Sequence, residues 1–132
     1  MSSIPLWSVY HVKDCKQSNP KKDKFVIIIC RYPDLMGFFI NTEIRPYILN
    51  NQKLLKLQVE IDFENHPKIK KNRWIDCSDL KKGFLESELN DYKYKVSDEV
   101  RNKIEKAISV SDNIEGRDKK SILGSSPQIT LD

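Results

Sequence analysis

Two apolar runs in the first third of the chain end in polar side chains that could together bind an anion. The stretch DKFVIIICRYPDLMGFFINTE spans residues 23–43, with Lys24 at the head of the first run and Asn41 and Thr42 at the end of the second. Arg45 follows shortly after. If the runs are neighbouring strands, an ammonium and a hydroxyl meet at one end of a sheet, where they could hold a common anionic centre. The same residues also suit a solvated sheet rim, so both interpretations stay open.

Basic residues gather in two segments of a chain whose formal net charge is +4. The first segment, KKDK, places Lys21 and Lys22 beside Lys24, and the second, KIKKNR, ends at Arg73. Clusters of this kind usually mark solvated loops, and less often a patch that binds a polyanion.

The other reactive side chains indicate neither a metal site nor a covalent nucleophile. The three cysteines are widely spaced and form no C-x-x-C pair, and the chain has only two histidines, so the sequence argues against a zinc site. The same cysteine usage favours a chain without disulfide bonds. No Ser-His-Asp set, paired-carboxylate motif or glycine-rich phosphate loop occurs. His11, near the end of an expected strand, could be a proton shuttle, because imidazole titrates near neutral pH, or a partly exposed structural histidine. We expect no cofactor.

The composition is that of one globular domain. A chain of 132 residues can bury a single core, and 39% hydrophobic beside 32% charged residues exclude the disordered and membranous classes. No apolar stretch approaches the ~18–20 residues of a membrane span. The start, MSSIPLWSVY, lacks the basic and long apolar regions of a signal peptide. We therefore expect a cytoplasmic protein with no membrane partner.

Five segments have the patterns of β-strands. Residues 25–30 form a continuous apolar, β-branched run, which predicts a central strand buried on both faces. Residues 57–63, LQVEIDF, alternate apolar and polar side chains, as is typical of a strand with one buried and one wet face. The other three segments are PLWSVYHV, FFINTE and RWIDCSDL.

One helix is predicted near the C-terminus. Ser97 is a suitable N-cap, and the acidic pair after it suits the positive end of the helix dipole. An apolar stripe then recurs at helical spacing, formed by Val100, Ile104, Ala107 and Ile108.

These elements predict a mainly β fold with α. Strands adjacent in sequence imply antiparallel pairing, so we expect a small, bent sheet or barrel of about five strands, capped by the C-terminal amphipathic helix. A single domain should span residues 1–115, and residues 116–132 should form a polar, poorly ordered tail.

The order of these segments resembles the MazF/PemK (Kid-like) toxins of type II toxin–antitoxin systems over about residues 6–114. The family's second strand usually begins with Arg-Pro and a β-branched run, and its next strand ends in Thr or Ser; DKFVIII and FFINTE hold these places here. WSVYHV, LQVEID, RWIDCSDL and the closing KVSDEVRNKIEKAI follow in the family's order. Departures are Trp7-Ser8 for Gly-Asp, Lys24-Phe25 for Arg-Pro, and SDLKKGF for the Ile-Arg-Thr stretch. The resemblance implies an SH3-like (CcdB/Kid-like) antiparallel barrel.

The activity that the resemblance implies is metal-independent cleavage of single-stranded RNA. The ribose 2′-OH attacks the neighbouring phosphate and leaves a 2′,3′-cyclic phosphate. Carried over by position, the family's catalytic residues fall on Lys24 and Thr42, or on Asn41 in place of Thr42 if the alignment slips by one residue. A lysine can hold a phosphate without the bidentate fork of arginine. To act as an acid or base near neutral pH, Lys24 would need a pKa lowered by burial or by cations such as Lys21 and Lys22.

The remaining implications concern binding. Arg45, which could instead pair with Glu43, would guide the RNA together with Lys21, Lys22, Asn41 and Arg73. The resemblance also implies a homodimer with an RNA groove between its subunits, and a cognate antitoxin that blocks this groove. The alternative is a barrel of the same shape that has lost cleavage and binds a protein or a nucleic acid. The lysine in place of the family's arginine motivates that alternative.

Overall fold

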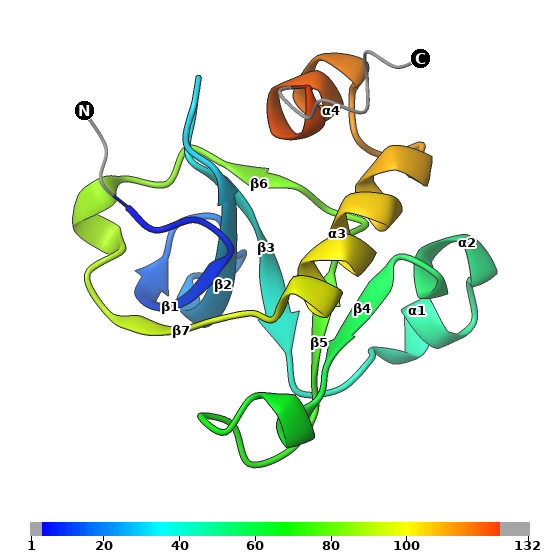
Figure 1. The fold of residues 1–132 in the computed structure, drawn as a ribbon, viewed down its shortest axis with the longest axis horizontal. Coiled ribbons are helices and arrows are strands. Elements are labelled where there is room, and N and C mark those ends of the chain that lie inside the picture. The colour runs from blue at the N-terminus through cyan, green and yellow to red at the C-terminus, as the bar shows by residue number, and fades with distance from the viewer. Residues whose placement is uncertain (1–3, 125–132) are drawn as a thin grey trace.

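The computed structural model describes residues 4–124, in which one antiparallel sheet curls into a half-barrel with helices around it (Figure 1). The strand order is β4-β5-β3-β2-β1-β7, with β6 paired to β3. The strands are β1 (Ser8–Cys15), β2 (Lys22–Cys30), β3 (Met36–Asn41), β4 (Gln58–Ile61), β5 (Arg73–Asp76), β6 (Lys81–Lys82) and β7 (Tyr92–Lys95). The α-helices are α1 (Pro46–Leu49), α2 (Gln52–Leu55), α3 (Asp98–Val110) and α4 (Gly116–Leu123), and two 3-10 turns span Phe63–Asn65 and Glu86–Glu88. The mainly β fold class is thus confirmed.

Strand β2 lies in the middle of the sheet and is buried on both faces, as its apolar run predicts. Ile27 and Ile29 belong to the larger apolar core, which lies under α3. Val26 and Ile28 point to the opposite face and pack in a second core around Tyr10. This burial, continuous from Val26 to Cys30, fixes β2 and leaves its first residues, Lys22 to Phe25, at the rim of the sheet.

Helix α3 covers the larger core from one side (Figure 1). It begins after Ser97, whose hydroxyl accepts a hydrogen bond from the backbone N–H of Val100 at 3.2 Å. The predicted apolar stripe is buried and packs toward β4. In the described part of the chain, no helix is long and apolar enough to cross a membrane.

Residues 116–123 form helix α4, where the sequence analysis expects a poorly ordered tail. Two contacts explain the difference. Ile122 and Leu123 pack against the larger core, and the buried carboxylate of Asp118 pairs with the ammonium of Lys82 at 2.6 Å. Residues 125–132 of the expected tail lie outside the described residues.

The described residues also form more strands than the expected five. Strands β6 and β7 lie in a stretch whose sequence shows no clear strand pattern, because β6 is two residues long and none of the four residues of β7 is buried. Strand β1 continues to Cys15, so His11 lies within this strand rather than near its end.

His66 ties the loop after β4 to the start of α3. Its Nδ1 lies 2.8 Å from the carbonyl oxygen of Asp62, and its Nε2 accepts a hydrogen bond from the backbone N–H of Ser97 at 3.1 Å. The ring is 3% exposed and also contacts the edge of Tyr94. The basic loop that follows His66 is therefore anchored at its first residue.

Gly37 provides a test of the β2–β3 pairing. A Cβ atom added at Gly37 would overlap the carbonyl oxygen of Ile27 on the neighbouring strand. We therefore expect Gly37→Ala to lower the free energy of unfolding by about 1–3 kcal/mol, measured by urea denaturation. Gly116→Ala is the matched control because nothing lies within 4 Å of its Cβ position, and it should change stability little. Equal stability of the two variants would contradict the close approach of the strands.

Candidate functional site

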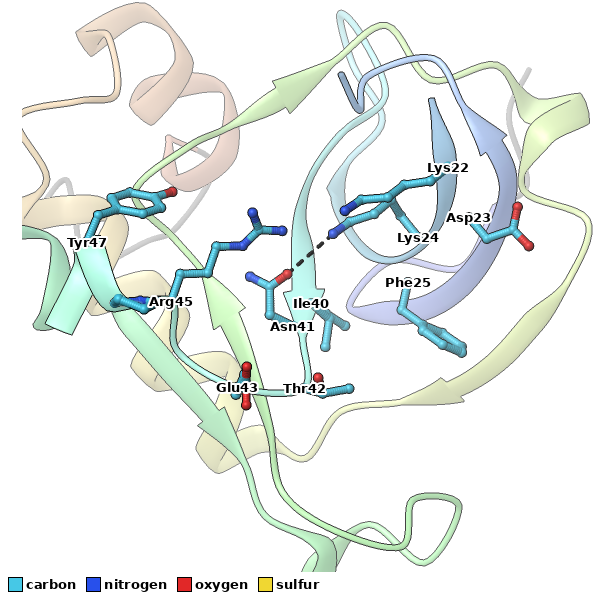
Figure 2. Close-up of a pocket in the computed structure, with 11 residues that line it drawn as sticks. Lys22, Asp23, Lys24, Phe25, Ile40, Asn41, Thr42, Glu43, Arg45 and Tyr47 are labelled. Carbon is cyan, nitrogen blue, oxygen red and sulfur yellow. Dashed lines mark hydrogen bonds between the residues drawn. The ribbon is translucent and has the colours of Figure 1, made fainter. Parts of the chain in front are cut away.

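A pocket of about 660 Å³ lies at the rim of the sheet, where β2 begins, β3 ends and α1 starts (Figure 2). We call it the rim pocket; residues 22–25, 40–43 and 45–47 line it. Both groups of polar residues singled out by the sequence, at the head of β2 and after β3, thus contribute to one concave surface.

The register of β2 and β3 places Lys24 against Asn41. Phe25 pairs with Ile40, so the next positions outward, Lys24 and Asn41, face one another across the antiparallel ladder. The ammonium of Lys24 donates a hydrogen bond to the side-chain oxygen of Asn41 at 3.3 Å (Figure 2). Because side chains alternate along a strand, Phe25 and Ile40 point to the other face of the sheet.

Lys24 is a buried lysine among other cations. Lys24 is 9% exposed, and this burial lowers the pKa of its ammonium below the ordinary lysine value. The positive charges of Lys22 and Arg45 lower this pKa further, and Lys81 acts in the same direction. The structure thus contains a cause for the pKa shift that acid–base chemistry would require, although Lys21 is not among the residues responsible.

Lys81 is a residue that the sequence analysis does not select. It comes from the two-residue strand β6, and its ammonium lies 5.1 Å from the centre of the Phe39 ring, while that of Lys24 lies 4.8 Å from the same ring. Lys81 also pairs with Asp79 at 2.8 Å. A hollow of about 240 Å³ here shares Lys22, Lys24, Asn41 and Arg45 with the rim pocket and adds Phe39, Asp79 and Lys81.

Arg45 stands at the start of α1 and points its guanidinium toward Asn41 and Lys22 (Figure 2). Pro46 at the first helical position fixes the turn that presents it. Among the described residues, Arg45 forms no ion pair with Glu43, which was the alternative role for this arginine. Its positive charge is therefore free to meet an anion in the rim pocket.

Thr42 lines the rim pocket but does not meet Lys24. It is exposed, follows the last residue of β3, and lies on the far side of Asn41 from Lys24 (Figure 2). The partner of the lysine is Asn41, which is the residue that a one-position slip of the family alignment would select.

Of the other candidates, Lys22 lines the rim pocket, whereas Lys21 does not. Arg73 lines a different pocket on the other face of the sheet. His11 lies outside the rim pocket. Its Nε2 is 3.7 Å from the carboxylate of Asp23, and its Nδ1 is 3.7 Å from that of Asp91. In the described residues, no group of three or more His, Cys, Asp and Glu side chains is placed to hold a metal ion.

The comparisons with known proteins address the fold. No protein-family model and no curated protein sequence matches the chain. Solved structures do match: the Mycobacterium tuberculosis toxin MazF-mt6 superposes with a TM-score of 0.58 at 13% identity, over 82% of this chain and 98% of the toxin. An endoribonuclease from a mycobacterial species superposes with a TM-score of 0.51 at 17% identity, over 91% of each chain. The chain therefore has a MazF-like fold.

Proposed function

We propose that the protein is a MazF-like endoribonuclease toxin that cleaves single-stranded RNA at the rim pocket. The observation that carries the proposal is Lys24, a buried, hydrogen-bonded lysine surrounded by further cations in the rim pocket. The fold that forms this pocket is shared with a toxin and an endoribonuclease. A pocket of this charge favours a substrate with closely spaced negative charges, such as a nucleic-acid backbone.

The proposed reaction is an internal transfer at one phosphate. The 2′-oxygen forms a bond to phosphorus, the bond from phosphorus to the 5′-oxygen of the next nucleotide breaks, and a 2′,3′-cyclic phosphate and a 5′-hydroxyl result. One group must remove the 2′ proton, another must protonate the leaving 5′-oxygen, and positive charge must stabilise the pentavalent phosphorane. Side chains can supply all three functions without a metal ion.

Lys24 is suited to two of these functions, stabilising the phosphorane and protonating the leaving 5′-oxygen. As an ammonium it would stabilise the phosphorane together with Arg45 and Lys22, and its lowered pKa makes it a stronger proton donor than an ordinary lysine. Asn41 acts as a positioning residue, because its amide oxygen holds the ammonium at one place on the rim.

Glu43 is the carboxylate that we assign to removal of the 2′ proton. Of the two carboxylates that line the rim pocket, Asp23 already accepts a hydrogen bond from the backbone N–H of Asp14 at 3.0 Å. Glu43 is exposed and has neither a hydrogen bond nor an ion pair within the described residues. It can therefore approach a bound ribose without breaking an existing contact.

The biological setting follows from the same family likeness. We extend the proposal to a cytoplasmic toxin that acts as a homodimer on RNA and is neutralised by a cognate antitoxin that covers the groove. The alternative, a barrel that binds without cleaving, keeps the same pocket but predicts intact RNA.

The first test of this proposal is the role of Lys24. Long single-stranded RNA incubated with the protein in EDTA should be cut, and Lys24→Met should lower the rate by about 10²–10³-fold through loss of the stabilising charge. Because the pKa of Lys24 is lowered, the rate should fall with rising pH earlier than for an ordinary lysine. Lys24→Arg should keep more activity than Lys24→Met, with its alkaline decline moved to higher pH, since guanidinium stays charged.

Lys16→Met is the control for this series, because Lys16 is an exposed loop lysine that lines none of the pockets described. RNA of many lengths and compositions that remains intact with the wild type would reject cleavage and favour the binding alternative.

A second test separates Asn41 from Thr42. We expect Asn41→Ala to lower the cleavage rate about 10- to 100-fold, because a hydrogen bond to a charged group contributes about 1.5–3 kcal/mol. The alkaline decline of the rate should also move to lower pH. The shift has this sign because the lost hydrogen bond stabilised the charged form of Lys24. Thr42→Ala should retain both rate and pH profile. A larger loss in Thr42→Ala than in Asn41→Ala would restore threonine as the catalytic partner and contradict our assignment.

A further inference from the structure

A second pocket of about 530 Å³, which we call the aromatic pocket, adjoins the rim pocket. It is lined by Phe25, Ile40, residues 68–70, Arg73 and residues 92–94. Phe25 and Ile40 line the rim pocket as well, so the two hollows share a wall. A ligand that occupies the rim pocket can therefore continue into the aromatic pocket.

Two aromatic rings stand partly free in this pocket. Phe25 is 42% exposed and Tyr92 is 51% exposed. Neither ring is loose: Phe25 packs edge-to-face on His11, with ring centres 5.1 Å apart, and Tyr92 packs in the same way on Tyr10 at 5.8 Å. Each ring is thus held from one side while it keeps accessible surface.

Cations surround these rings, and no carboxylate among residues 4–124 lines the pocket. The positive charges are Lys68, Lys70, Arg73 and Lys93. Arg73 is held in place because its guanidinium donates hydrogen bonds to the carbonyl oxygens of Lys71 at 3.1 Å and Asn72 at 3.4 Å. The anchored His66 fixes the start of the loop that carries the lysines.

Tyr94 adds a polar group to the same surface. Burial raises its pKa to about 12, so its hydroxyl stays protonated and can donate a hydrogen bond at any physiological pH. The pocket therefore combines apolar ring surface, fixed positive charge and a hydroxyl donor.

We infer that the aromatic pocket binds an unpaired nucleotide adjacent to the cleaved phosphate, with its base against Phe25 and Tyr92 and its phosphate at Arg73 and the loop lysines. The inference rests on the proposed function and adds a subsite to it. Exposed rings beside cations match a nucleotide better than an acidic peptide, since carboxylates need only the cations and leave the rings unused. Bases of a duplex are stacked on one another, so only an unpaired base can reach the rings.

Binding of an uncleavable RNA tests the subsite apart from catalysis. The probe is a fluorescein-labelled, mixed-sequence 2′-O-methyl RNA of about 12 nucleotides, which lacks the attacking hydroxyl; its affinity is measured by fluorescence anisotropy. We expect Phe25→Leu and Tyr92→Leu each to weaken binding about 5- to 100-fold, because leucine keeps apolar bulk but removes the stacking face. Tyr32→Leu is the matched control, since Tyr32 is 82% exposed and lines neither pocket.

An abasic oligonucleotide of the same length separates base binding from simple charge attraction. It should bind the wild type more weakly than the RNA does, and Tyr92→Leu should not weaken it further. Lys68→Gln/Lys70→Gln should weaken both probes and reduce the salt dependence of binding. The control is Lys13→Gln/Lys16→Gln, which changes an exposed lysine near the end of β1 and another in the turn that follows.

The outcomes distinguish the subsite from the function on which it rests. If the wild type cuts RNA but both leucine variants bind the probe as Tyr32→Leu does, the subsite is wrong and the endoribonuclease proposal stands. If the abasic oligonucleotide or poly-L-glutamate binds as tightly as the RNA, the pocket is a surface for polyanions or acidic peptides, which also overturns the inference. A wild type that neither binds nor cuts RNA rejects the proposed function and the subsite together.

Discussion

The pairing of β2 with β3 is the constraint on which the site depends. Burial of β2 on both faces fixes its position, and the close approach at Gly37 fixes the distance to β3. With Phe25 opposite Ile40, the register places Lys24 opposite Asn41 on the β3 side of the strand. A shift by one residue would turn the lysine to the opposite face and separate it from Phe39, Lys81 and the rest of the cationic group.

Placing an ammonium in this position is unfavourable for folding. Burial and the nearby cations both oppose the charge of Lys24, as the direction of its pKa shift shows. The hydrogen bond to Asn41 and the face of the Phe39 ring offset part of this cost. Ionisable groups with strongly shifted pKa values concentrate where proteins bind or transform ligands. The unfavourable burial of the Lys24 charge therefore supports a functional role for the rim pocket.

The sequence predicts those parts of the fold and site that depend on local pattern. The apolar run of β2 is encoded within about a dozen residues, and so are the apolar stripe and the N-cap of α3. The polar residues at the strand ends are equally local. Lys81 is different, because β6 is two residues long and reaches the site only by pairing with β3, some forty residues earlier in the chain. Helix α4 was missed for a similar reason, since its buried carboxylate depends on Lys82. The choice between Asn41 and Thr42 required the register, which no local pattern supplies.

Because successive side chains of a β-strand point to opposite faces of the sheet, adjacent residues of β2 serve different parts of the proposed site. Lys24 faces the cationic side of the rim and Phe25 the aromatic side, so a bound strand has to pass over the edge of the sheet to reach both. Such a path bends the backbone of the strand. A stacked duplex resists this bend, whereas a single strand adopts it at little cost. A preference for unpaired RNA would then follow from the shape of the rim, before any base is read.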